Sequence, residues 1–307
     1  IGRWRRTRIT GRWLRGSRSG EVRTVGEQTT ETAHTDPYCV KHCEPGVRHS
    51  QCGCSCSHKR PRLLDLYCCA GGASMGYHRA GFEVFGLDNN QRADYPFPAL
   101  RGDAIAALDF LLDGRALKWW TRNARGEHVA RLLTLGDFAA VVGSPPCQAH
   151  TTLTKGNRGR GWMDGHTDLI AATRGRMIAT GKPYVIENVV GARAELIDPV
   201  MLCGLSFDLR VFRHRLFESN VELTVPAHPS HKGHRVAGWR HGVKHEGDMF
   251  AVYGDGGGKG TTAEWQAAMG IDWTEDRACL AEAIPPAYTE HLGRQLIEHI
   301  DTEEAAA

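Results

Sequence analysis

Four short apolar runs, separated by stretches long enough for helices, constrain the fold of this 307-residue chain more than any other feature. The runs occupy residues 63–67, 82–88, 138–143 and 182–188, and each ends at glycine or polar residues. Strands that alternate with helices predict a mostly parallel sheet covered on both faces. We therefore expect an α/β fold with a doubly wound, Rossmann-like sheet. Such sheets bind ligands at the carboxyl ends of their strands.

A glycine turn follows the first run. Asp65 and Tyr67 precede Gly71 and Gly72, and residues 74–81 have helical character. Glycine lets a ligand approach the backbone closely, and the helix N-terminus behind the turn favours negatively charged or polar groups. Taken alone, this pattern is equally typical of a turn that only packs tightly.

Two acidic residues extend the candidate ligand site. Asp88 ends the second run, about 20 residues after the turn, where an acid commonly holds the two hydroxyls of a ribose. Asp103 follows in the next loop, where a third strand end could meet an adenine amino group. Together with the glycine turn, these acids predict a cofactor that contains adenosine.

Cys147 is the candidate nucleophile. It follows Pro145 and Pro146 at the end of the third run and precedes a polar, glycine-rich segment, residues 155–165. The prolines fix the direction of the backbone, and a thiolate at a strand end can act as a nucleophile. A lone cysteine is more often a small buried apolar residue, but these neighbours argue against that interpretation.

Further polar residues suit acid–base and anion chemistry. Glu187 ends the fourth run and can protonate or hydrogen-bond a ring nitrogen, and Asn188 can brace it. Arg213 and Arg215 flank His214 in a segment with extended character, and their guanidinium groups suit a carbonyl oxygen and a carboxylate or phosphate. Each of these residues has an alternative role in a surface ion pair.

In their order along the chain, the segments DLYCCAGGAS, SPPCQ, IENV and RHRLFES resemble conserved blocks of the DNA cytosine-5 methyltransferases of bacteria and phages. The resemblance extends from about Leu63 to Phe217 and resumes at residues 283–288. It implies a class I methyltransferase fold, S-adenosylmethionine as cofactor, and double-stranded DNA with a flipped-out cytosine as substrate.

The resemblance also implies a role for each site residue. Cys147 would bond to C6 of cytosine, Glu187 would engage N3 and the exocyclic amine, and Arg215 would contact O2. Arg213 would support the nucleophile loop, and Asn188 would brace it. The implied cofactor-binding residues are Asp65, Tyr67, Gly71, Gly72, Asp88, Asp103 and Pro146. In this scheme Tyr67 lies against the adenine.

The chain departs from the family pattern at the cofactor turn. Cys69 stands where a glycine is usual, and Asn89 stands where an aromatic residue is usual. These departures leave open a related enzyme that transfers a different group from a modified cofactor, or one that acts on RNA. A catalytically inactive DNA-binding module is a further alternative. A nicotinamide-dependent oxidoreductase is disfavoured because the turn is not G-x-G-x-x-G.

We expect four regions along the chain. They are a basic, cysteine-rich arm at 1–61, a cofactor-binding catalytic domain at 62–220, a short target-recognition region at 221–265, and a C-terminal segment at 266–307 that returns to the catalytic domain. The third region mixes basic and aromatic residues, which favours nucleic acid over a small substrate. Residues 155–165 are expected to form a mobile loop whose cations meet DNA phosphates.

The N-terminal arm carries seven arginines and no acid in residues 1–20, although the net charge of the whole chain is only +3. Five cysteines of the arm are candidate zinc ligands: Cys39, Cys43, Cys52, Cys54 and Cys56. Their spacing is not a paired CxxC pattern, so disordered, reduced cysteines are favoured over a zinc knuckle.

Transmembrane segments need about 20 consecutive apolar residues, and the sequence contains no such stretch. We therefore expect a cytoplasmic protein of a bacterial or phage-infected cell. We further expect a monomer that takes part in DNA methylation within restriction-modification or phage self-protection.

Overall fold

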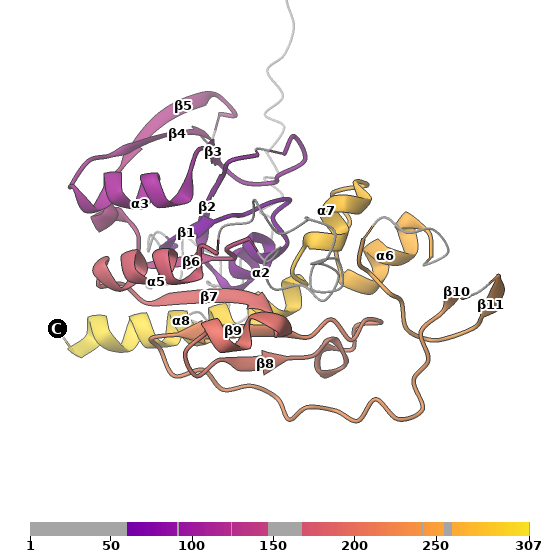
Figure 1. Cartoon of the computed structure of the whole chain (residues 1–307). Helices are drawn as coiled ribbons and strands as arrows, with labels where there is room; N and C mark the ends of the chain where they lie inside the picture. Colours follow the sequence, from indigo (N-terminus) through magenta and orange to yellow (C-terminus); the bar gives the residue numbers. More distant parts are fainter. Residues whose placement is uncertain are drawn as a thin grey trace, which may run out of the picture. The chain divides into compact units, whose positions relative to one another are not determined.

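A computed structural model describes residues 60–90, 92–123, 125–146, 168–240, 242–254 and 260–306. Its centre is a seven-stranded sheet in the order β3-β2-β1-β6-β7-β9-β8 (Figure 1). The strands are β1 (Arg62–Leu66), β2 (Glu83–Asp88), β3 (Ala99–Arg101), β6 (Ala140–Gly143), β7 (Tyr184–Val189), β8 (Val200–Leu202) and β9 (Arg215–Ser219).

The sheet is mostly parallel. β1, β2, β3, β6 and β7 pair in parallel, whereas β9 is antiparallel to both β7 and β8. The chain proceeds from β1 outward to β3 and then returns to the other side of β1 at β6, so the strand order reverses between β1 and β6. This arrangement confirms the predicted doubly wound, Rossmann-like fold and makes the β1–β6 boundary its topological switch point.

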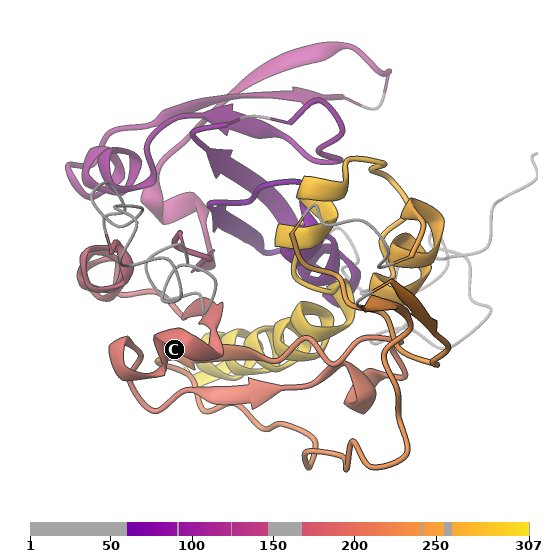
Figure 2. The ribbon, with the colours of Figure 1, turned by 45° about the vertical axis from the view of Figure 1, so that its right-hand side comes forward.

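Helices cover both faces of the sheet (Figures 1 and 2). α3 (Ala104–Leu112) and α5 (Ile170–Ala179) pack on one face, and α2 (Gly72–Ala80) and α8 (Pro286–Ala306) pack on the other. In β1, Leu64 and Leu66 join the core under α3 and α5, whereas Leu63 joins the core under α2 and α8. Because neighbouring strand residues face opposite ways, a parallel strand buried on both faces is a continuous apolar run.

The C-terminal helix α8 buries one side of its surface against α2. Pro286 is its first residue, where a proline costs no hydrogen bond. The two helices approach very closely at Gly76, where an added Cβ atom would lie 2.0 Å from Thr289 Oγ1. This contact places the C-terminal segment directly behind the glycine turn.

The remaining elements lie outside the sheet. β4 (Leu117–Arg122) and β5 (His128–Leu133) form an antiparallel hairpin. β10 (Gly238–Arg240) and β11 (Val243–His245) form a second one within residues 221–265, the predicted target-recognition region. α6 (Thr262–Met269) and α7 (Arg277–Glu282) share a small separate core with Val211, Phe250 and Val252. Short 3-10 helices occupy Leu135–Asp137, Val190–Glu195 and Gly204–Phe207.

Within the described residues, none of the helices combines the length and the apolar surface that crossing a membrane requires.

Candidate active site

The candidate residues gather at one edge of the sheet, where the parallel strands β1, β2, β6 and β7 end. The backbone N–H of Tyr67 donates to Leu87 O at 2.8 Å, which ties the end of β1 to β2. The N–H of Ser144 donates to Leu66 O at 3.2 Å, which ties the segment after β6 to β1. The glycine turn and the Ser-Pro-Pro segment therefore meet at the switch point, as the strand-end argument predicts.

The glycine turn has an unusual backbone. Gly71, which precedes α2, has φ 83°, and two residues that are not glycine also have positive φ: Tyr67 at 59° and Cys69 at 44°. A left-handed conformation costs roughly 1 kcal/mol or more for such residues and is often found at functional sites. A glycine in place of Cys69 would avoid this strain. Trp273 Nε1 donates to Ala70 O at 2.8 Å and holds the turn from outside.

A buried polar chain lies behind the turn. Ser74 Oγ donates to the carboxylate of Asp65 and also lies 2.9 Å from the hydroxyl of Tyr95. Burial raises the pKa of Asp65 to about 7, against the effect of the Ser74 hydrogen bond. Tyr95 is not among the residues predicted from the sequence. Its signal is Gly86 in the interior of β2, where an added Cβ would lie 2.1 Å from the Tyr95 hydroxyl oxygen.

Asp88 holds the turn as well as ending β2. Its carboxylate accepts hydrogen bonds from the backbone N–H groups of Cys69 at 2.9 Å and Asn90 at 2.8 Å. A carboxylate offers about four lone-pair sites, so these two bonds leave capacity for ligand hydroxyls. The expected ribose contact of Asp88 is compatible with this geometry and stays a prediction.

Asp103 and Tyr67 have structural partners that the sequence analysis did not foresee. Asp103 is exposed and caps α3, since its Oδ1 accepts from the N–H of Ala106 at 2.8 Å. The Tyr67 hydroxyl lies 2.9 Å from Thr173 Oγ1 on α5. Aspartate at the start of a helix is a common cap, and this signal was present in the sequence. The expected adenine contacts of both residues stay predictions.

Glu187 and Arg215 form a buried ion pair at the same edge. Arg215 Nε lies 2.9 Å from Glu187 Oε1, with side-chain exposures of 14% and 10%. Burial raises the pKa of Glu187, while Arg215, a hydrogen bond from Ser144 and the charge of Arg213 act in the opposite direction. Glu187 is therefore a carboxyl group with an increased tendency to be protonated, which is what a hydrogen-bond donor to a ring nitrogen needs.

Asn188 lies beside this pair and contacts the segment that leads to the candidate nucleophile. Its Nδ2 donates to Pro145 O at 3.0 Å, and its Oδ1 accepts from the N–H of Val189 at 2.9 Å. Both groups of the amide are used, so the orientation of the side chain is fixed. Asn188 thus contacts the loop that it is expected to brace.

Arg213 has a different environment from the one expected. Its guanidinium donates to the backbone carbonyl oxygens of Ala281, Ala283 and Val252, at 2.7, 2.5 to 2.9 and 2.6 Å respectively. Its own backbone is left-handed, with φ 31°. These contacts make Arg213 a clamp between the start of β9 and the C-terminal segment. Support of the nucleophile loop by Arg213 stays a prediction.

Several sequence candidates lie outside the described residues. They are Cys147, the segment 155–165, and the N-terminal cysteines Cys39, Cys43, Cys52, Cys54 and Cys56. Pro146, the last described residue before Cys147, is partly buried at the switch point.

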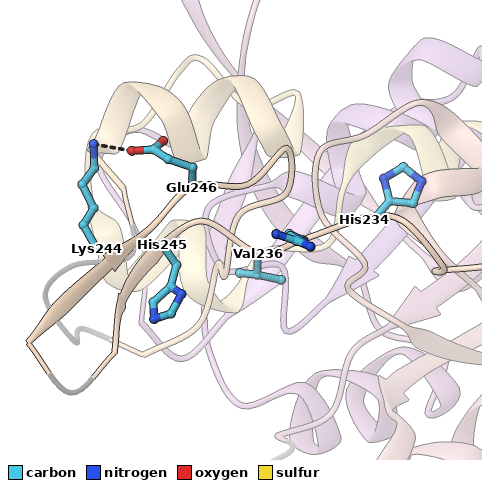
Figure 3. A pocket seen from close by; sticks show the side chains of 6 residues that line it. His234, Val236, Lys244, His245 and Glu246 are labelled. Atoms are coloured by element: carbon cyan, nitrogen blue, oxygen red, sulfur yellow. Dashed lines mark ion pairs between the residues drawn. The ribbon is translucent and has the colours of Figure 1, made fainter.

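An open hollow of about 530 Å³ lies in the predicted target-recognition region (Figure 3). It is lined by His234, Arg235, Val236, Lys244, His245 and Glu246. Lys244 Nζ pairs with Glu246 Oε1 at 2.7 Å. Most of the lining side chains are cationic or imidazole groups, so the hollow suits an anionic ligand such as a phosphate group.

No protein-family model and no curated protein matches the sequence. Solved structures are similar to it in fold, among them the following two, each with 12% sequence identity. One is a putative DNA modification methyltransferase encoded within an Escherichia coli prophage, with a TM-score of 0.46 over 78% of this chain and 99% of that chain. The other is the Entamoeba histolytica methyltransferase EhMeth, with a TM-score of 0.43 over 79% of this chain and 99% of that chain.

Proposed function

We propose that this chain transfers a methyl group from S-adenosylmethionine to C5 of a flipped-out cytosine in double-stranded DNA, with Cys147 as nucleophile. One observation carries the proposal: the buried Glu187–Arg215 pair lies next to Asn188, whose side chain holds Pro145 two residues before Cys147. An acid, a cation and the loop of a candidate nucleophile thus share the edge that carries the glycine turn.

The residues at this edge suit attack on a pyrimidine ring. The thiolate of Cys147 forms a bond to C6, and the ring electrons move toward C5. Glu187, whose pKa is raised by burial, hydrogen-bonds N3 in its protonated form and makes the ring a better electrophile. Arg215 stabilises negative charge at O2. After transfer to C5, a base removes the C5 proton and elimination releases the thiolate.

The residues around the glycine turn fit the proposed cofactor. An adenosine moiety needs close backbone approach and an acid for its ribose, and the turn at Gly71 and Asp88 offers both. Tyr67, Gly72, Asp103 and Pro146 are the other residues that would hold it, with Asp65 behind the turn. When bound, S-adenosylmethionine supplies an electrophilic methyl group. The strained Cys69 lies in the same turn and could reshape the site of the transferred group. The identity of that group is therefore tested directly, by the mass of the trapped complex described below.

The region at 221–265 is proposed to recognise the DNA. Its β10–β11 hairpin exposes Trp239 and Val243, and the adjoining hollow gathers Arg235 and Lys244. Exposed apolar side chains beside cations are suited to base and phosphate contacts together. We propose that one chain acts on one duplex.

Trapping with 5-fluorocytosine tests the proposal. Fluorine at C5 blocks the final elimination, so incubation with S-adenosylmethionine and a fluorinated duplex should leave a covalent complex that survives a denaturing gel. The duplexes carry randomised flanks, so that the fluorinated cytosine is presented in every sequence context. Wild type should form the adduct, Cys147→Ser should form none, and Glu187→Gln should form it at least about tenfold more slowly.

Cys279→Ser is the matched control, since it removes another thiol and should leave the adduct intact. An adduct that persists in Cys147→Ser would show that the nucleophile is wrongly assigned. A wild-type protein that binds the duplex and forms no adduct would favour an inactive DNA-binding module. The mass of the trapped complex reports whether the added group is a methyl, and a matched RNA duplex tests the RNA alternative.

A further inference from the structure

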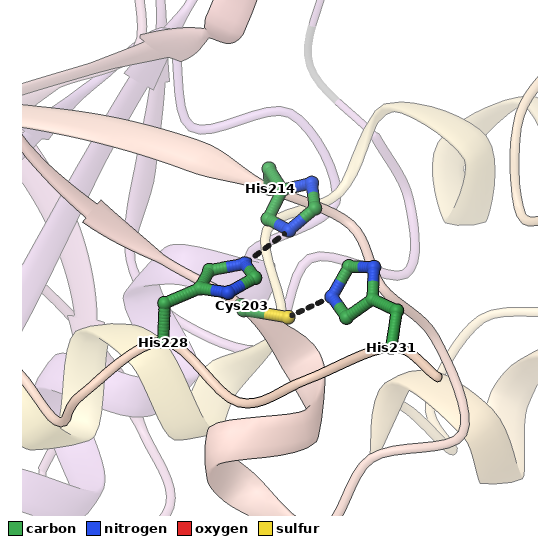
Figure 4. A group of neighbouring side chains, drawn as sticks. All are labelled: Cys203, His214, His228 and His231. Carbon is green, nitrogen blue, oxygen red and sulfur yellow. Dashed lines mark hydrogen bonds between the residues drawn. The ribbon is translucent and has the colours of Figure 1, made fainter. Parts of the chain in front are cut away.

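Four side chains from three separate segments converge beside the active-site edge (Figure 4). Cys203 follows β8, His214 precedes β9, and His228 and His231 belong to the connection between β9 and β10. One ligand atom from each residue lies within 4.8 Å of all the others. We infer that Cys203, His214, His228 and His231 bind a structural zinc ion.

The donor set is the first argument. One thiolate and three imidazoles are ligands that zinc prefers, and four of them complete its tetrahedral shell. Around zinc, the edges of such a tetrahedron are about 3.3 to 3.6 Å long, from bond lengths near 2.0 Å to nitrogen and 2.3 Å to sulfur. Here His214 Nε2 lies 2.9 Å from His228 Nε2, and Cys203 Sγ lies 3.3 Å from His231 Nε2. Small side-chain rotations are enough to reach the tetrahedral spacing.

The thiol of Cys203 has hydrogen-bond donors beside it. The backbone N–H groups of Leu205 and Ser206 hydrogen-bond its sulfur, and they would stabilise a zinc-bound thiolate.

Ring stacking orders the three histidines of the cluster. The ring of Phe212 stacks on His231 with 4.1 Å between centroids and 16° between planes. His214 stacks on both His228 and His231, with centroids 5.0 and 5.1 Å apart. The stacked rings bring the three imidazoles together at one point.

The position of the cluster suggests what the metal stabilises. Residues 220–237 of the described chain contain neither helix nor strand, and His228 and His231 tie this segment to β8 and β9. His214 also lies between Arg213 and Arg215, the clamp and the ion-pair partner of Glu187. A zinc ion here would join the proposed DNA-recognition region to the active-site edge and fix the Arg-His-Arg segment.

Metal analysis of the full-length chain tests the inference. A parent variant with serine at Cys39, Cys43, Cys52, Cys54 and Cys56 removes the competing N-terminal thiols. After dialysis against a weak chelator, mass spectrometry of the metal content should find one zinc per parent chain. His228→Ala, on an exposed loop, and Cys203→Ser should each lose it. His234→Ala should keep it, since His234 pairs with Asp248 outside the cluster.

Cobalt gives a second measurement that does not depend on activity. Co²⁺ added to the metal-free parent should give the visible absorption of a tetrahedral ion and a thiolate-to-cobalt band that is absent in Cys203→Ser. The circular dichroism spectrum of His228→Ala should match that of the parent, which shows that the variant has lost the metal and not the fold. A folded parent that retains no zinc, or zinc that persists in both His228→Ala and His231→Ala, would overturn the inference. Neither result bears on methyl transfer, which the 5-fluorocytosine trap tests separately.

Discussion

Asp65 is a buried carboxyl group behind the glycine turn. It is 1% exposed near the carboxyl end of β1, and its described hydrogen bond comes from Ser74. Burial raises its pKa from the ordinary 3.8 to about 7, so near neutral pH the folded protein binds a proton that the unfolded chain has already lost. Stability must therefore depend on pH through this one group.

Asp65→Asn should remove that dependence. Because the pKa of Asp65 is higher in the folded protein than in the unfolded chain, protonation of Asp65 favours the folded state. This contribution to the free energy of unfolding is fully present below about pH 4 and is lost as the pH rises through about 7. Since one pKa unit corresponds to about 1.4 kcal/mol, the free energy of unfolding of wild type should fall relative to Asp65→Asn by up to about 4 kcal/mol across this window. Urea titrations at several pH values measure the difference.

Asp109 provides the contrasting control. It is exposed on α3, and its hydrogen bond from Arg176 lowers its pKa. The stability contributed by Asp109 is present at neutral pH and lost in acid, so Asp109→Asn should change the pH dependence slightly and in the opposite direction. If wild type and Asp65→Asn keep a constant difference from pH 4 to 8, Asp65 is not the buried neutral carboxyl described here.

The positions of the site residues could be predicted from sequence patterns, but their contact partners could not. The strand-end positions of Asp65, Asp88 and Glu187 follow from apolar runs and could be predicted. The partners of these residues could not, because they come from distant parts of the chain. Tyr95 reaches Ser74 across 21 residues, and Trp273 reaches Ala70 across 203. Asp103 shows a different limit, since one acid before a helix suits both a cap and a ligand contact.

Among the elements, the buried parallel strands and the helix after the glycine turn were predictable, whereas the β4–β5 hairpin and the antiparallel pairing of β9 were not. β1, β2, β6 and β7 are continuous apolar runs, which is the signature of strands covered on both faces. The β4–β5 hairpin has alternating burial instead, with Trp119 and Thr121 buried and Trp120 exposed. This alternation can be seen in the sequence, but it is too short to identify a strand. The antiparallel insertion of β9 depends on partners far along the chain, so no local pattern reveals it.

The junction of α5 with β9 depends on one buried ion pair. Arg174 donates to both carboxylate oxygens of Glu218, at 2.6 and 2.7 Å, and Glu218 is 1% exposed. Arg174→Met should destabilise the fold by about 3 kcal/mol, because it leaves a buried carboxylate without its cation. Thermal or urea unfolding measures the loss.

Arg176→Met is the matched control on the same helix. Arg176 also makes a bidentate pair, with Asp109, but that pair is at the surface. Exposed ion pairs contribute little because water screens them. Equal destabilisation by the two substitutions would contradict the buried-pair argument, and a double variant with Glu218→Gln should recover part of the loss in Arg174→Met.

At the scale of the whole described structure, long-range polar contacts join three separate cores. The two large cores lie on opposite faces of the sheet, and the third lies around α6 and α7. Arg213 joins the start of β9 to Val252 and Ala283 of the third core, and its neighbour His214 belongs to the cluster with Cys203, His228 and His231. Sequence spacing did not reveal either site, because their residues are up to 70 positions apart.

Arg213→Lys tests whether this residue acts mainly as a clamp. Lysine keeps the charge but cannot place donors in the fork that reaches Ala281, Ala283 and Val252 together. Hydrogen bonds from charged groups contribute about 1.5 to 3 kcal/mol each, so losing one or more should lower the free energy of unfolding by about 2 kcal/mol in the absence of DNA. Arg210→Lys, an exposed arginine with one such bond to Asp248 O, should change it little. An unchanged stability of Arg213→Lys with a slower rate of 5-fluorocytosine trapping would instead assign Arg213 to the reaction itself.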